Sequence, residues 1–124
     1  MEARNSSVAL GADLSGSHLE GADFTGASLK NANSSNATFN QTNLSKADLS
    51  GANLNRAWLV EMTLNGVNLT GADLSNAELQ EVDLNGANLT GVDLTKATLE
   101  EVKVDGAILC RTKLPRGVVN SGCK

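Results

Sequence analysis

The chain has 124 residues, of which 14 are acidic and 10 are basic, and its formal net charge is −4. This length fits one domain, no apolar run approaches the ~18 residues that a membrane-spanning helix needs, and no basic stripe suits a nucleic-acid backbone. Only two Phe and one Trp are aromatic and Tyr is absent, so an ordinary globular core is not expected and a repeat should be sought first.

The first segment, residues 1–11, reads MEARNSSVALG. It lacks the apolar stretch of a secretory signal peptide, although a signal removed from a longer precursor would leave no trace here. We expect these residues to form an N-terminal cap that precedes the repeats.

A five-residue period runs through residues 12–116. Each unit has a small inner residue and, two places later, a large central residue, which is Leu in 17 of 21 units and otherwise Phe24, Ser34, Phe39 or Val104. A helix would place residues five apart about 140° from each other around its axis, and a straight strand would send them to opposite faces. A chain that bends after every unit keeps all central residues inside. The period therefore predicts a solenoid whose coils pair at about 4.8 Å.

The repeating unit also resembles that of a known family. The sequences ADLSG (12–16), ANLNR (52–56) and ADLSN (72–76) fit the pattern A-[D/N]-L-x-x of pentapeptide repeat proteins. The resemblance covers residues 12–116. It implies an all-β fold, a right-handed quadrilateral β-helix with four units per coil, and therefore about five coils.

The two residues after each central residue must turn the chain by about a right angle. The second of them is Gly in nine units and Asn in three, which suits the positive φ of a type II turn. With four units per coil, residues n and n+20 stack, and one column of corners reads Gly21, Gln41, Glu61, Glu81, Glu101. Because the inner residue after each corner from Gln41 on is larger than alanine, we expect this column to depart from type II beyond the first coil.

The last segment, residues 117–124, is expected to cap the solenoid, because an open coil invites end-to-end pairing. Cys110 and Cys123 lie 13 residues apart, and a bridge across such a loop would stabilise the fold by roughly 3 kcal/mol. A disulfide and two free thiols both fit this pattern. The stretch KLPRG…NSGC also resembles tails of cyanobacterial and chloroplast members of the family. A bridge would indicate the thylakoid lumen or periplasm, and free thiols the cytoplasm.

Residues that could carry chemistry are few. His18 is the only histidine and is interpreted as a surface residue. The Asp and Asn that precede many leucines recur as even ladders without a convergent cage, so we expect no metal site. Ser34 leaves a deficit of volume between Leu14 and Leu54, which Phe24 or Phe39 would fill from inside the core. We predict no catalytic residue and no cofactor.

One face concentrates acidic side chains around a tryptophan. The units centred on Leu19, Phe39, Leu59, Leu79 and Leu99 contain six Glu and no Lys or Arg. Trp58 occupies an outward slot there, with Val60 on the same side, and an exposed Trp ringed by one sign of charge is typical of an interface anchor. The alternative is that the acidic residues only protect a flat face from aggregation. The predicted interface comprises Trp58, Val60, Glu61, Glu78, Glu81, Glu100 and Glu101.

The predicted function is that of a noncatalytic structural or interaction module with an unidentified protein partner. We expect no nucleic-acid or membrane partner, and a monomer with a dimer left open. The alternative is a DNA-mimicking inhibitor or protector of a type II topoisomerase, DNA gyrase, as the resemblance implies for quinolone-resistance members of the family.

Overall fold

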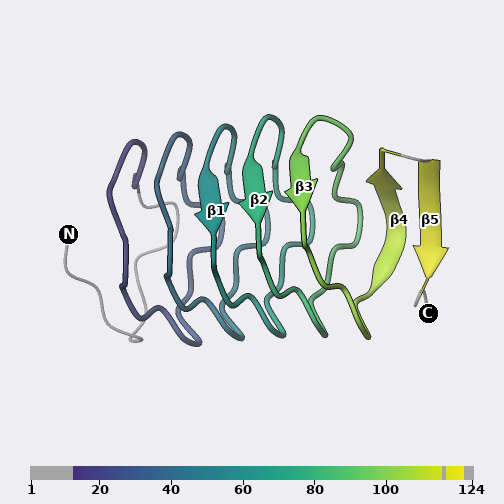
Figure 1. Ribbon diagram of the computed structural model, residues 1–124, viewed down its shortest axis with the longest axis horizontal. Helices are drawn as coiled ribbons and strands as arrows, with labels where there is room; N and C mark the ends of the chain where they lie inside the picture. Colours follow the sequence, from purple (N-terminus) through teal and green to yellow (C-terminus); the bar gives the residue numbers. More distant parts are fainter. Residues whose placement is uncertain (1–12, 116, 122–124) are drawn as a thin grey trace.

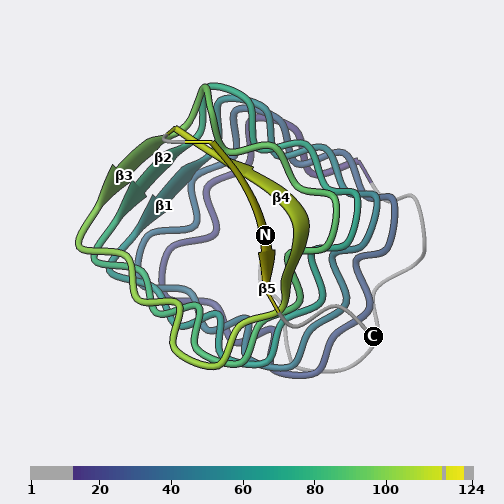
Figure 2. The ribbon, with the colours of Figure 1, turned by 90° about the vertical axis from the view of Figure 1, so that its right-hand side faces the viewer.

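A computed structural model describes residues 13–115 and 117–121, with side chains described only as far as Pro115. The chain winds as a four-sided solenoid, a right-handed quadrilateral β-helix (Figures 1 and 2). The described residues contain β structure and turns and no helix. The predicted fold class is confirmed.

The coils stack in parallel with a register of 20 residues. Bridges join Asp13 to Asn33, Asn33 to Asn53, and Asn53 to Asp73, and the other three faces repeat the same spacing. Four five-residue units therefore complete one coil, as predicted. On one face the pairing lengthens into a three-stranded parallel sheet of β1 (Trp58–Val60), β2 (Glu78–Gln80) and β3 (Thr98–Glu100), in that order.

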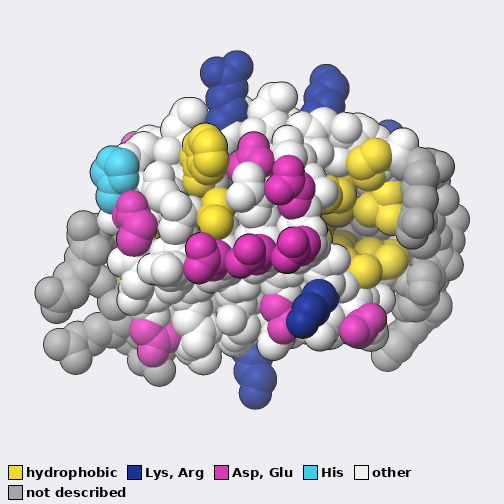
Figure 3. All heavy atoms as spheres, in the orientation of Figure 1, with side chains coloured by type: hydrophobic (Ala, Val, Ile, Leu, Met, Phe, Trp, Pro, Cys, Tyr) yellow, Lys and Arg dark blue, Asp and Glu magenta, His cyan; other side chains and the backbone are white. Residues whose placement is uncertain are grey.

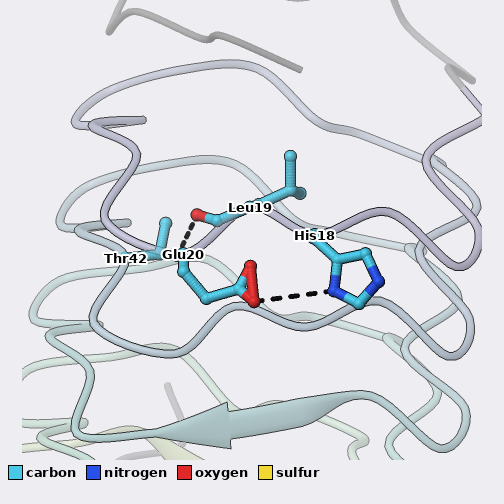
Figure 4. A network of polar contacts seen from close by, with 4 residues as sticks. All are labelled: His18, Leu19, Glu20 and Thr42. Carbon is cyan, nitrogen blue, oxygen red and sulfur yellow. Dashed lines mark hydrogen bonds and ion pairs between the residues drawn. The ribbon is translucent and has the colours of Figure 1, made fainter.

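The core is a stack of central and inner side chains. Every central residue from Leu14 to Leu94 is buried, and Phe24 and Phe39 are fully buried, which confirms them as core residues. Ser34 is also fully buried, and its Oγ has no hydrogen-bond partner. By contrast, the buried Thr42 hydroxyl donates to the Leu19 carbonyl oxygen at 2.8 Å (Figure 4). An unsatisfied buried hydroxyl costs about 1–3 kcal/mol, so Ser34 is a weak point of the second coil.

At almost every corner, the second of the two turn residues has the left-handed backbone conformation. Of the 20 corner positions from 16 to 111, nine glycines and ten other residues have positive φ, and Lys96 is the exception. The local preference for Gly or Asn predicted this conformation at twelve units only. Coil stacking imposes it elsewhere. At Gly51 the requirement is stronger, because φ is +67° and a Cβ atom would collide with the side-chain oxygen of Asn31.

The predicted departure of one corner column is correct in part. A hydrogen bond from the inner amide to the preceding central carbonyl closes the corner at Thr42, which donates to Phe39 at 2.9 Å. Among the described residues this bond is missing after Leu59, Leu79 and Leu99. The prediction is therefore wrong for the second coil. The reasoning from size was also incomplete, because Val67 closes its corner with a 3.1 Å bond to Leu64. The open corners are those that follow β1, β2 and β3, where the chain stays extended one residue longer.

The C-terminal end carries an antiparallel hairpin of β4 (Leu109–Leu114) and β5 (Gly117–Ser121). Residues of β4 still stack on the coil below, since Lys113 pairs with Asp93. The core is less covered here: Val104 is 38% exposed, and a largely apolar hollow of about 460 Å³ opens beside it. The predicted N-terminal cap, residues 1–11, lies outside the described residues, and the predicted domain boundaries stay predictions.

Candidate protein-binding face

The face that carries β1, β2 and β3 is called the acidic face below. It consists of residues 17–21, 37–41, 57–61, 77–81 and 97–101. Figure 3 shows acidic side chains gathered over the three strands beside a hydrophobic pair. All seven predicted interface residues belong to this face.

On the other three faces, many outward side chains serve the fold directly. In most units of these faces Asp or Asn precedes the central residue, and its Oδ1 accepts from the amide, and often from the hydroxyl, of the residue two places later. Asp48 accepts from the Ser50 amide at 2.9 Å and from the Ser50 hydroxyl at 2.6 Å, and Asn68 and Asn88 repeat this with a threonine. These bonds satisfy a corner amide. The Asp and Asn ladders thus have a structural role at the corners.

The same bonds tune the acidity of several carboxyl groups. The Ser50 hydroxyl holds the pKa of Asp48 below its usual value, since a hydrogen bond to the charged form favours it. The hydroxyls of Ser15, Thr25 and Thr95, with their amides, lower the pKa of three further aspartates in the same way, namely Asp13, Asp23 and Asp93.

The acidic face is the one face with no Asp or Asn in that slot in any described coil. The residues there are His18, Thr38, Trp58, Glu78 and Thr98. None of them makes the Oδ1 bond that supports the corners elsewhere, so the fold places few demands on their side chains. The composition of this face has to be explained by something other than the turn.

Trp58 is the exposed apolar centre of this face. It is 50% exposed, which confirms the exposure predicted for it. It stacks between Thr38 and Glu78 of the neighbouring coils. Val60 is half-buried two residues along the same strand. One aromatic ring and one aliphatic side chain thus form an apolar spot surrounded by carboxylates.

Glutamates line the open corners beside this spot. Glu61, Glu81 and Glu101 are exposed and occupy one column, with φ values of 54°, 54° and 53°. A left-handed conformation costs a residue with a Cβ atom about 1 kcal/mol, and nine other corners avoid this with glycine. Successive carboxylates also repel one another across a spacing of about 4.8 Å. The packing and hydrogen bonds of the described residues therefore do not explain why glutamate recurs in this column.

A shallow groove lies beside the last two open corners. It has a volume of about 340 Å³ and is lined by Glu81, Val82, Asp83, Glu101 and Lys103. Sequence reasoning included the two glutamates but missed Val82, Asp83 and Lys103. The 20-residue register brings Glu101 and Lys103 beside Glu81 and Asp83, and no single unit of the sequence shows this groove.

The remaining predicted interface residues are also on the surface. Glu100 is exposed, and Glu78 is half-buried and accepts a 2.9 Å hydrogen bond at its Oε2 from the side-chain Nε2 of Gln80. His18 is exposed at the first coil, with its Nδ1 3.5 Å from Glu20 Oε2 (Figure 4). Whether these side chains bind a partner stays a prediction.

Other kinds of site were sought in the part of the chain that the structure describes. No group of three or more His, Cys, Asp or Glu residues there could hold a metal ion. That part also contains no helix long and apolar enough to cross a membrane. Cys110 is disulfide-bonded, whereas Cys123 lies outside the described residues, so the pairing of these two cysteines stays a prediction.

The repeat, its 20-residue register and the four-sided coil agree with a comparison of the sequence with known families. The family described as "Pentapeptide repeat region" matches residues 12–89 and, in a second alignment, residues 32–109. The chain belongs to the pentapeptide repeat family. A search of curated proteins found no match.

Solved structures of similar proteins come from bacteria and a plant. Rfr23, a pentapeptide repeat protein of the cyanobacterium Cyanothece 51142, is 34% identical over 77% of this chain and 62% of its own, with a TM-score of 0.44. A pentapeptide repeat protein of the Arabidopsis thaliana thylakoid lumen is 24% identical over 89% of this chain and 66% of its own, with a TM-score of 0.43. QnrB1, a plasmid-mediated fluoroquinolone resistance protein, is 22% identical over 90% of this chain and 63% of its own, with a TM-score of 0.47. The match thus spans less than two thirds of the Rfr23 chain and of this trypsin-treated variant chain of QnrB1.

Proposed function

We propose that this pentapeptide repeat protein is a noncatalytic interaction module that binds a partner protein through its acidic face. The observation that carries the proposal is Trp58, an exposed aromatic residue on the one face whose outward side chains the corners do not use. Exposed aromatic residues beside an apolar neighbour are frequent anchors of protein interfaces. The proposed interface comprises Trp58, Val60, Glu61, Glu78, Glu81, Glu100 and Glu101.

The rigidity of the scaffold supports this role. Amide-to-carbonyl bonds of about 3 Å link each coil to the next on every face, such as the bond from Trp58 to Ala37 at 2.9 Å. A face held in this way presents its side chains without reordering on binding, which lowers the entropic cost of association.

The test is capture of a partner from an extract of the native source by the immobilised protein. Trp58→Ala and Glu81→Lys should each reduce the captured protein strongly while leaving the melting temperature nearly unchanged. Arg56→Glu is the matched control, because Arg56 is also an exposed corner residue with positive φ, on the preceding face, and its charge is reversed by the same amount. A partner that is retained by both acidic-face variants but lost with Arg56→Glu would move the binding site to the other face.

A supercoiling assay distinguishes the proposed function from the alternative, in which the protein acts on DNA gyrase as a DNA mimic. A mimic needs acidic charge distributed along the rod, whereas the face preceding the acidic face carries Arg56, Lys96 and Lys113. We expect no inhibition of gyrase supercoiling and no protection from a quinolone at protein concentrations that saturate the acidic face. Either effect would favour the alternative.

A further inference from the structure

The charge and shape of the acidic face indicate what kind of segment it binds. We infer that the partner presents an extended, arginine-containing basic segment, which lies along the column of Glu61, Glu81 and Glu101 and places one guanidinium group on the ring of Trp58. This inference rests on the proposed function and deepens it.

The first support is the sign of the charge. All six charged carboxylate side chains of the face are glutamates, no Lys or Arg occurs in its five units, and His18 lies at the first coil beside Glu20. Lys103, on the neighbouring face, is the one positively charged side chain in the lining of the groove. A basic segment would remove the mutual repulsion within the glutamate column, and such complementarity also speeds encounter.

The second support is the groove at the open corners. Three of its five lining residues, Glu81, Asp83 and Glu101, carry carboxylates, whereas Val82 is buried in the core. A long basic side chain can lie along this groove with its charged head at the carboxylates. Arginine suits this arrangement better than lysine, because its planar guanidinium group binds a carboxylate through two parallel hydrogen bonds.

The third support is the aromatic ring of Trp58, which lies three residues before Glu61 on the same face. Trp58 is half exposed, and an arginine over the face of a tryptophan ring gains a cation–π interaction. The half-buried Val60 continues the apolar surface along β1. The ring and the carboxylates therefore favour the same side chain.

The spacing predicts how the basic residues are arranged. Three stacked corners span about 9.6 Å, twice the distance between coils. In an extended peptide, residues i and i+2 point to one side about 6.8 Å apart, so two arginines at this spacing fit within the column. Arginines at i and i+6 would be about 20 Å apart, and only one of them would reach it.

The experiment uses Trp58 as the reporter, because it is the only tryptophan in the chain and tyrosine is absent. The full chain is titrated with a blocked Ser-based peptide that carries two arginines at i and i+2, and with a second blocked peptide of equal length and charge whose two arginines are six residues apart. The first should change the emission of Trp58 saturably, and the second should bind several-fold more weakly.

Two matched triple variants locate the contact. Replacing Glu61, Glu81 and Glu101 by Gln should weaken binding of the peptide with arginines at i and i+2 about tenfold, because the exposed ion pairs of its arginines with the column are lost. The control replaces Asp13, Asp73 and Asp93 by Asn, which removes the same charge from the preceding face, where Asn33 and Asn53 already occupy the same column. The control should change the affinity less than twofold.

The outcomes separate the inference from the proposed function. The inference of a basic segment would be overturned by the absence of a saturable change in emission. It would also be overturned if both triple variants weakened binding of the peptide equally. If a captured partner depends on Trp58 but tolerates the Glu-to-Gln variant, the inference fails and the proposed function stands. If the partner tolerates Trp58→Ala and Glu81→Lys, the proposed function fails as well.

Discussion

Truncation of a central leucine tests the packing that the five-residue period implies. Leu69 is 1% exposed and lies between Leu49 and Leu89, its stacked neighbours, which are equally buried. Leu69→Ala removes three carbon atoms, or about 2.4 kcal/mol at 0.8 kcal/mol per buried methylene. The coils above and below are held by backbone bonds and cannot collapse fully, so a void of roughly 50 Å³ would add about 1.2 kcal/mol. The expected loss of unfolding free energy is about 3.5 kcal/mol.

Urea unfolding followed by circular dichroism measures this loss, and an unchanged slope confirms that the mutation affects stability alone. Leu74→Ala, equally buried, should behave alike. Leu99→Ala is the control, because Leu99 is only partly buried at the last coil and fewer atoms surround it on one side, so its loss should be clearly smaller. A loss below about 1 kcal/mol at both Leu69 and Leu74 would refute the packing argument.

Two further predictions concern protonation and the tail. The pKa of Asp48 is lower in the folded chain, so the stabilisation it gives is present above the unfolded value of about 3.9 and is lost as the pH falls through the folded value. Asp48→Asn, which keeps the acceptor and matches Asn68 in the same column, should therefore reduce the fall in melting temperature between neutral pH and about pH 3. For the tail, we expect no reactive thiol in the unfolded, unreduced protein, because Cys110 is disulfide-bonded and Cys123 is the only other cysteine; two reactive thiols would contradict the pairing.

The core could be predicted from the sequence because its rule is local and repeated. Leu or Phe at every fifth position, with Ala or Val two places earlier, leaves one geometry in which all of them are inside. Ser34, the one polar central residue, was also recognisable as a deficit of volume, although its unsatisfied hydroxyl was not. A reader of the sequence knows the volume of a side chain but not whether a carbonyl group lies within reach of it, as one does for Thr42.

The corners could be predicted less well, because tertiary structure overrides local preference there. Lys46 and Arg56 have positive φ, although neither residue favours it, since the inter-coil bonds fix the backbone on both sides of each corner. Conversely, Lys96 is the one corner residue from 16 to 111 without a positive φ. The Asn76 amide donates to the Lys96 carbonyl oxygen at 3.0 Å, whereas the equivalent amide of Arg56 donates to the residue before the corner residue, Ser75. The conformational preference of a single residue contains no information about the coil that stacks on it.

The candidate site can be recognised from which positions of the five-residue unit the fold constrains. The inner and central positions are fixed by packing, and on three faces the outward Asp or Asn is fixed by its bond to the corner amide. On the acidic face that bond is absent, the chain remains extended through residues 60, 80 and 100, and the next corner opens. Side chains there can change without disturbing the turn, so folding constrains them less than it constrains the outward Asp and Asn of the other faces. For this reason the sequence identifies Trp58 and the glutamate column as unusual members of the repeat, while the chemistry of the partner has to be inferred from the groove and charges that the stacked coils bring together.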